Sequence, residues 1–227
     1  MDNHPKSDAV KLPSKEAMVQ MFETVYAARN PEQLPWAHMG EHPGIRLWRE
    51  HNPTAALLEG KGKRALIVGC GLGDDAEGFA ALGYHVTAFD ISTHAIEWCR
   101  ERFPTSSVDY RTADLLAPPP AWHQAFDLVL EVFTIQALPI GIRAQVIANI
   151  ADFVAPSGTV LVVALAREEE TELGMPPWPL SPSELREFET AGLTCTQQVF
   201  HKKGHRDRLL SVSEYARPPA PDTTTKP

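Results

Sequence analysis

Short strand-like segments alternate with stretches of helical periodicity through most of the chain. In the helical stretches, apolar residues recur on one face, as at Ile142, Val146 and Ile150. The strand-like segments lie at 65–68, 85–89, 108–111, 126–132 and 159–165. Such alternation predicts an α/β fold with a doubly wound, mainly parallel sheet and helices on both of its faces.

The two ends of the chain complete this pattern. Apolar spacing after Ser14 predicts a helix to Arg29, and Ser181 with Glu184 has the spacing of a capping box at the start of a last helix. Segments 193–200 and 209–212 can form a final strand pair, which brings the expected sheet to seven strands. We therefore expect one domain over 14–215, with disordered polar ends at 1–13 and 216–227.

Two segments inside this domain lack periodicity and are rich in proline. They cover residues 30–53 and, after the fifth strand, residues 166–180. Long irregular segments in a compact domain are often functional. We expect the first to act as a lid and the second to be an insertion beside it.

Composition narrows the functional classes. The 227 residues include 21 Lys and Arg against 29 Asp and Glu, a net charge of −8, which argues against a duplex nucleic-acid binder. The longest apolar run, Val160 to Ala166, is far shorter than the roughly 20 residues of a membrane span, and no secretory signal is visible. The three cysteines have no metal-ligand spacing. A cytoplasmic protein without metal is expected.

A glycine loop follows the first strong strand. Gly69, Gly71 and Gly73 would let the backbone turn sharply and approach a ligand. The dinucleotide fingerprint requires a further glycine at position 74, where this chain has Asp74, followed by Asp75. Two carboxylates at a helix start suit an amino group or a hydroxyl better than a diphosphate.

The next two strand ends carry carboxylates. Asp90 ends the second strand and could accept two hydrogen bonds from a ribose diol. Asp114 follows the third strand, where it could contact an adenine amino group. This order of groups suits an adenosine ligand with a positive or zwitterionic tail.

The chain resembles the class I S-adenosylmethionine-dependent methyltransferases over residues 64–163. The matching segments are ALIVGCGLGDD, VTAFDIS, TADLL, FDLVLEVFTIQALP and APSGTVLVV, and they are most similar to the thiopurine and small-molecule branch. The resemblance implies a Rossmann-like fold with S-adenosylmethionine as cofactor. It assigns cofactor contacts to Gly69, Gly71, Gly73, Asp74, Asp90, Ile91, Asp114, Leu115 and Glu131.

One position departs from the family pattern. Many members carry an acid two residues before the first glycine, whereas this chain has Ile67 there. The role of that carboxylate is either dispensable or taken over by Asp74.

The acceptor side is expected in the two proline-rich segments. Trp36, His38, His42 and Trp178 are its candidate contacts, within an apolar lid that excludes water. The implied reaction is methyl transfer to a small molecule, with sulfur as the expected acceptor atom. A thiolate acceptor needs no general base, whereas an oxygen or nitrogen acceptor with a high pKa requires one. The sequence does not assign a catalytic residue.

Two other functions stay open. A non-catalytic protein could keep the fold and bind the cofactor without turnover. An NAD-dependent oxidoreductase is disfavoured by Asp74 in the fingerprint. Nucleic acid and membrane partners are not expected, and the sequence does not specify an oligomeric state.

Overall fold

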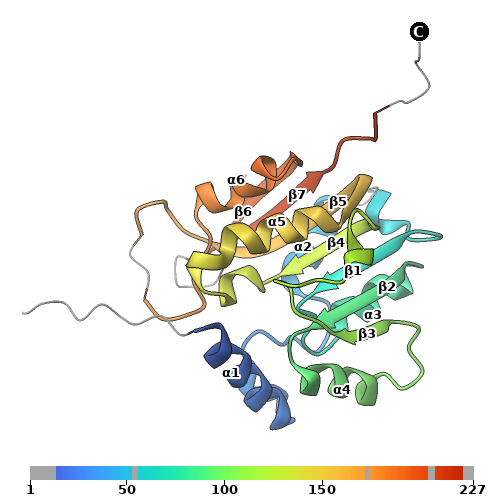
Figure 1. Cartoon of the computed structure of the whole chain (residues 1–227), viewed down its shortest axis with the longest axis vertical. Coiled ribbons are helices and arrows are strands. Elements are labelled where there is room, and N and C mark those ends of the chain that lie inside the picture. The colour runs from blue at the N-terminus through green and yellow to red at the C-terminus, as the bar shows by residue number, and fades with distance from the viewer. Residues whose placement is uncertain (1–13, 53–55, 172–173, 204–207, 222–227) are drawn as a thin grey trace, which may run out of the picture.

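The fold is built on a seven-stranded, mainly parallel sheet (Figure 1). A computed structural model describes residues 14–52, 56–171, 174–203 and 208–221. The strand order is β3-β2-β1-β4-β5-β7-β6, with β1 to β5 paired in parallel and β7 antiparallel to both of its neighbours. The strands are β1 (Arg64–Val68), β2 (His85–Asp90), β3 (Asp109–Thr112), β4 (Phe126–Val132), β5 (Val154–Ala166), β6 (Thr194–Lys203) and β7 (Arg208–Ala216). The predicted sheet and its final strand pair are confirmed.

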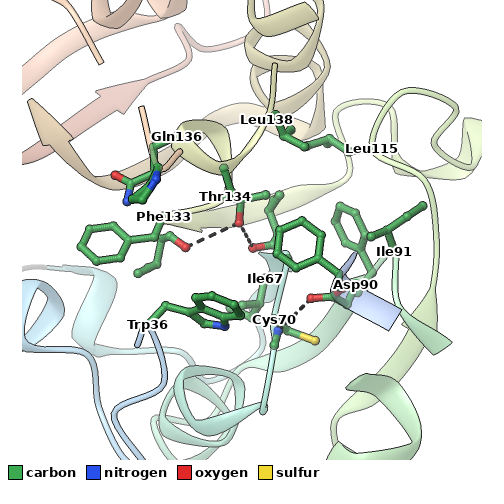
Figure 2. A pocket seen from close by; sticks show the side chains of 18 of the residues that line it. Trp36, Ile67, Cys70, Asp90, Ile91, Leu115, Phe133, Thr134, Gln136 and Leu138 are labelled. Carbon is green, nitrogen blue, oxygen red and sulfur yellow. Dashed lines mark hydrogen bonds between the residues drawn. The ribbon is translucent and has the colours of Figure 1, made fainter. Parts of the chain in front are cut away.

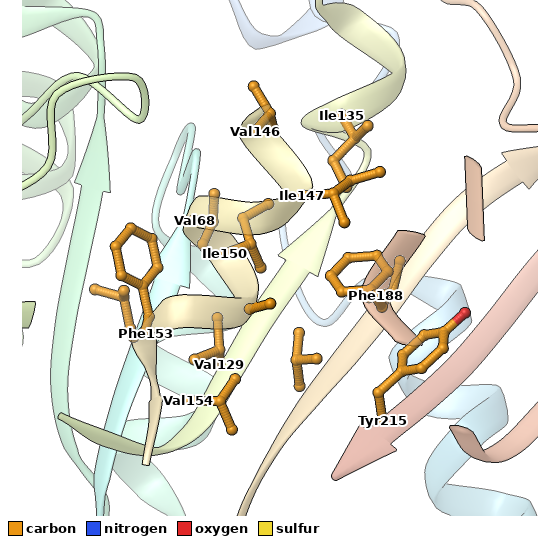
Figure 3. Close-up of a cluster of buried hydrophobic side chains, with 14 of the residues drawn as sticks. Val68, Val129, Ile135, Val146, Ile147, Ile150, Phe153, Val154, Phe188 and Tyr215 are labelled. Atoms are coloured by element: carbon orange, nitrogen blue, oxygen red, sulfur yellow. The ribbon is translucent and has the colours of Figure 1, made fainter. Parts of the chain in front are cut away.

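Buried side chains form two large clusters on the sheet. Alternate strand residues point to opposite faces, so Val160 and Val162 belong to one cluster while Leu161 and Val163 belong to the other. Side chains of α5 and α6 join the first cluster, which Figure 3 shows, and those of α2, α3 and α4 join the second. The helices are α1 (Lys15–Ala27), α2 (Pro43–His51), α3 (Asp74–Ala81), α4 (Thr93–Arg102), α5 (Arg143–Phe153) and α6 (Pro182–Thr190).

Helix α2 corrects the prediction that 30–53 is wholly irregular. His42 caps this helix, because its Nδ1 accepts a hydrogen bond from the Gly44 N–H at 3.1 Å, and Pro43 occupies the first turn. Ile45 and Trp48 are buried on the sheet, and the Trp48 indole N–H donates to Glu214 on β7. Because histidine is not a usual N-cap residue, the start of this helix is hard to predict from the sequence. Only the first part of the segment is free to border a site.

The C-terminal boundary also differs from the prediction. Ala216 pairs with Thr159 and with Thr194, so it belongs to the sheet rather than to a tail. Arg217 donates to the carbonyls of Ala151 and Val154, both at 2.7 Å. Residues 1–13 and 222–227, for which disorder is expected, lie outside the described residues.

Among the described residues, every helix is too short or too polar to cross a bilayer.

Candidate active site

A cavity of about 760 Å³ lies beyond the carboxyl ends of β1, β2 and β4 (Figure 2). This is the place where open α/β sheets bind ligands, and the volume is typical of a small-molecule site. The glycine loop and the ends of β2 and β3 form one half of its lining. The other half comes from α1, from residues 35–42 and from segments after β4 and β5. We call these the strand-end half and the lid half.

The glycine loop adopts a backbone that requires glycine. Gly69 and Gly73 have φ values of +59° and +84°, in the left-handed region. A Cβ on Gly69 would lie 2.3 Å from the Thr134 hydroxyl, and one on Gly73 would lie 2.6 Å from the Tyr110 hydroxyl. All three predicted glycines line the cavity, as predicted for a loop that cradles a ligand.

Asp90 is fixed at the centre of the strand-end half. Its Oδ2 accepts the Gly71 N–H and its Oδ1 accepts the Ser92 N–H, both at 3.0 Å. Burial raises the pKa of this carboxyl, whereas the backbone hydrogen bonds oppose that rise. Each carboxylate oxygen keeps further acceptor capacity, so Asp90 can also accept from a diol. Ile91 lies beside it on the cavity wall.

Asp114 and Leu115 close the same half. The Asp114 carboxylate accepts the Leu116 N–H at 2.9 Å and pairs with the Lys15 ammonium of α1 at 2.6 Å. Both residues line the cavity, where the sequence places an adenine edge. The salt bridge links the start of α1 to the strand-end half.

The two adjacent acids of the loop have different partners. The Asp74 carboxylate accepts two hydrogen bonds from Arg102, at 2.7 and 2.8 Å, and Arg102 also binds the carbonyl of Leu72. Asp74 lines the cavity, and Arg102 on α4 neutralises its charge. Which acid Arg102 would reach was not visible in the sequence.

Asp75 is the acid that faces the cavity without such a partner. Its Oδ1 accepts the backbone N–H of His42 at 2.9 Å, and among the described residues it makes no ion pair. Burial raises the pKa of Asp75 to about 7, with smaller contributions from the negative charges of Asp74 and Glu41. The sequence shows Asp75 next to Asp74 but does not indicate which of the two carboxylates stays unpaired.

Glu131 does not line the cavity, contrary to prediction. It points to the face covered by α5, where its Oε1 accepts the N–H groups of Thr134 and Ile135 at 2.7 and 2.9 Å. Burial raises its pKa to about 7. Within the described structure no partner reaches its Oε2. Glu131 therefore shapes the turn after β4 and holds Thr134 against the glycine loop.

Three of the four predicted acceptor contacts lie in the lid half. Trp36 donates its indole N–H to the Tyr26 hydroxyl at 3.1 Å, and in Figure 2 it lies on the same side of the cavity as Phe133. The His42 ring meets the His38 and Phe133 rings edge to face, with centroids 4.7 Å apart in both pairs. All of these residues line the cavity.

Trp178 is the exception among the predicted acceptor contacts. It is fully buried and donates its indole N–H to the carbonyl of Gly174 at 2.7 Å, while its own carbonyl accepts from Arg143. It therefore anchors the segment after β5 rather than touching the cavity. Pro176 and Pro177 line the cavity in its place.

Helix α1 supplies contacts that the sequence analysis missed. Met18, Val19, Met21 and Phe22 all line the lid half. Their helical spacing was visible, but a helix face that packs on a core and one that faces a ligand have the same pattern. In the ranges that the structure describes, no group of three or more His, Cys, Asp or Glu side chains is arranged to hold a metal.

Comparisons with known proteins point to one family. Residues 65–158 match the methyltransferase domain family. A probable thiol methyltransferase 2 of Arabidopsis thaliana is 29% identical over 135 residues, which cover 58% of this chain and 57% of that protein. A ubiquinone biosynthesis O-methyltransferase of Marinobacter nauticus is 34% identical over 116 residues, covering 49% of this chain and 48% of that protein. The chain thus spans about half the length of the curated relatives it matches.

Solved structures agree on the fold. The N-methyltransferase NodS from Bradyrhizobium japonicum, in complex with S-adenosyl-L-homocysteine, superposes with a TM-score of 0.67 at 20% identity. The match covers 88% of this chain and 98% of that one. Residues 65–158 thus resemble the methyltransferase domain family, and the chain shares the fold of this solved N-methyltransferase, with a glycine loop after β1 and an acid at the end of β2.

Proposed function

We propose that this protein transfers a methyl group from S-adenosylmethionine to the sulfur atom of a small, apolar acceptor. The observation that carries the proposal is the two-part cavity. Its strand-end half offers glycines and a fixed carboxylate, and its lid half offers aromatic, methionine and proline side chains.

The strand-end residues fit the cofactor. Gly69 and Gly73 line the cavity and cannot carry a Cβ, which would meet Thr134 or Tyr110, so the loop presents bare backbone to a ligand. Asp90 has acceptor capacity for the ribose hydroxyls, and Ile91 with Leu115 offers apolar walls to a base. Two acids follow the loop, a poor environment for the diphosphate of a dinucleotide.

When bound, the cofactor supplies an electrophilic methyl group on a positively charged sulfur. The chain's own residues then have to place the acceptor in line and keep water out, and such positioning can supply about 7–11 kcal/mol of the barrier. Trp36, Phe133 and Pro177 form an apolar wall suited to both tasks. No proton has to be moved for an acceptor that enters as a thiolate.

The lining of the lid half favours a soft, uncharged or weakly charged acceptor. Lys15 is the one Lys or Arg among the described lining residues, and Asp114 neutralises it. A phosphorylated or strongly acidic acceptor would find no counter-charge there. The similarity to a probable thiol methyltransferase supports sulfur as the methylated atom.

Oxygen is the second candidate atom. It is favoured by the similarity to an O-methyltransferase and by His38 and His42, which could take a hydroxyl proton in the lid half.

A transfer assay with a labelled cofactor tests the proposal. The protein is incubated with S-adenosylmethionine bearing a trideuteriomethyl group and with matched thiols, phenols and amines, and mass spectrometry follows the label. We expect labelled thioethers to form with higher kcat/KM than methyl ethers or methylamines. Label found only on oxygen or nitrogen would contradict sulfur, and binding without any transfer would favour a non-catalytic cofactor-binding protein.

A further inference from the structure

An apolar residue stands near the end of β1, where many members of the methyltransferase class carry an acid. Ile67 on β1 lies two residues before the glycine loop, is 3% exposed and lines the cavity. The amino-acid end of S-adenosylmethionine carries an ammonium group. Removing such a charge from water is costly unless it is paired, and Ile67 cannot pair with it.

Four carboxylates line the described cavity, and three of them are committed. Asp74 is held by the two hydrogen bonds from Arg102, and Asp114 is paired with Lys15. Asp90 accepts two backbone N–H groups on the side where a ribose would lie. The fourth, Asp75, accepts one backbone N–H from His42 and has no cation beside it among the described residues.

The position of Asp75 fits the same end of the cofactor. It is the second residue of α3, directly after the loop whose last glycine is Gly73. Burial raises the pKa of Asp75, and the nearby charges of Asp74 and Glu41 add to that rise, so a cation bound there would stabilise the ionised carboxylate. The start of α3 favours the ionised carboxylate as well.

We propose that Asp75 binds the ammonium group of the cofactor's amino-acid end and so replaces an acid that β1 does not carry in this chain. This inference rests on the methyltransferase function proposed above. It assigns to α3 a contact that the neighbouring Asp74 cannot make while Arg102 holds it.

The test compares two ligands that differ in the amino-acid end. S-Adenosylhomocysteine carries that end, whereas 5′-methylthioadenosine has the adenosine and the thioether without it. Calorimetry gives the dissociation constants of both ligands for the wild type, for Asp75→Asn and for the matched control Asp74→Asn. The ratio of the 5′-methylthioadenosine constant to the S-adenosylhomocysteine constant measures the preference for the amino-acid end. We expect Asp75→Asn to weaken S-adenosylhomocysteine by about tenfold or more, equivalent to about 1.4 kcal/mol, with 5′-methylthioadenosine bound as before. Asp74→Asn should lower the melting temperature and leave the ratio unchanged.

A second variant moves the charge back to the strand. Adding Ile67→Asp to Asp75→Asn should restore preference for S-adenosylhomocysteine, and binding of 5′-methylthioadenosine shows that each variant is folded. The inference would be overturned if Asp75→Asn kept the wild-type ratio, or if Asp74→Asn lowered the ratio instead. A wild type that binds neither ligand would instead remove the proposed function on which it rests.

Discussion

The two halves of the cavity are built in different ways. The strand-end half comes from residues 67–75, 89–91 and 113–116, each following a strand of the same parallel sheet. The lid half joins α1, residues 35–42, the turn after β4 and Pro176 with Pro177, which are far apart in the chain. The first half depends on the ends of neighbouring parallel strands, which the sheet brings to one edge. The second depends on how distant segments pack.

The halves also differ in how their polar groups are held. In the strand-end half, Asp90 is held by two backbone N–H groups, one from Gly71 in the glycine loop and one from Ser92 just after its own strand. In the lid half, Trp36 is held by the hydroxyl of Tyr26 on α1. Substitutions in the strand-end half should therefore affect cofactor binding, and those in the lid half should affect the acceptor.

The largest effect is expected for Gly73→Ala. The new Cβ would lie 2.6 Å from the Tyr110 hydroxyl on a residue with φ +84°, so the loop must shift. We expect loss of measurable S-adenosylhomocysteine binding and a stability loss of about 1–3 kcal/mol. Gly78→Ala is the control, since it lies on α3 with open space around it, and it should stabilise the fold by about 0.5–1 kcal/mol. If Gly73→Ala bound S-adenosylhomocysteine as tightly as the wild type, the glycine loop would not be the cofactor-binding segment.

Glu131 should contribute to how stability depends on pH, alongside Asp75. Burial raises its pKa from 4.5 to about 7, so the folded state binds the proton more tightly than the unfolded state. Stability should therefore fall as pH rises from about 4.5 to about 7, by about 3 kcal/mol from this group. In Glu131→Gln this contribution should disappear.

Urea unfolding at several pH values measures the difference between Glu131→Gln and wild type. The exposed Glu170→Gln is the control and should follow the wild-type curve. A difference between Glu131→Gln and wild type that stays constant across this range would show that Glu131 does not titrate there.

Asp90→Asn should weaken the cofactor through the ribose contact. The charge-assisted hydrogen bonds from a diol would be lost, which costs about 1.5–3 kcal/mol of binding free energy. Calorimetry with S-adenosylhomocysteine measures the change, and the exposed Asp109→Asn on β3 serves as the control. An unchanged dissociation constant would place the ribose elsewhere.

The smallest effects should separate the two predicted tryptophans. Trp36→Phe reshapes the lid half and should raise the KM of the acceptor, by less than about tenfold. Its dissociation constant for S-adenosylhomocysteine should stay near that of wild type. Trp178→Phe removes the hydrogen bond to Gly174 and should cost about 0.5–1.5 kcal/mol of stability, with KM unchanged. If Trp178→Phe raised the KM and Trp36→Phe changed only stability, Trp178 rather than Trp36 would contact the acceptor.

Sequence patterns predicted most of the strand-end half because its determinants are local. A strand, three glycines and Asp90 at the end of the next strand can be recognised in the sequence, and parallel strands bring these residues to one edge of the sheet. The sheet could be predicted because strand and helix patterns alternate along the chain. Helix α2 was missed because it is short and is capped by His42.

Residues whose role depends on a distant partner could not be assigned in this way. Asp74 and Asp75 are distinguished by Arg102, which lies a helix and a strand further along the chain. Glu131 alternates with Leu130 along β4, and the sequence does not say which of them faces α5. Trp178 and Pro177 are neighbours in the chain, and the burial of the Trp178 ring with its hydrogen bond to Gly174 shows which of them turns inward.

The most direct test of the account compares S-adenosylhomocysteine, S-adenosylmethionine and NAD as ligands of the same protein by thermal shift and calorimetry. The account predicts that both adenosyl ligands bind one per chain and that at 100 times the dissociation constant they stabilise the fold by about 2.7 kcal/mol. NAD should give no shift. Stabilisation by NAD alone, or by none of the three, would contradict the assignment of the glycine loop and Asp90 to this cofactor.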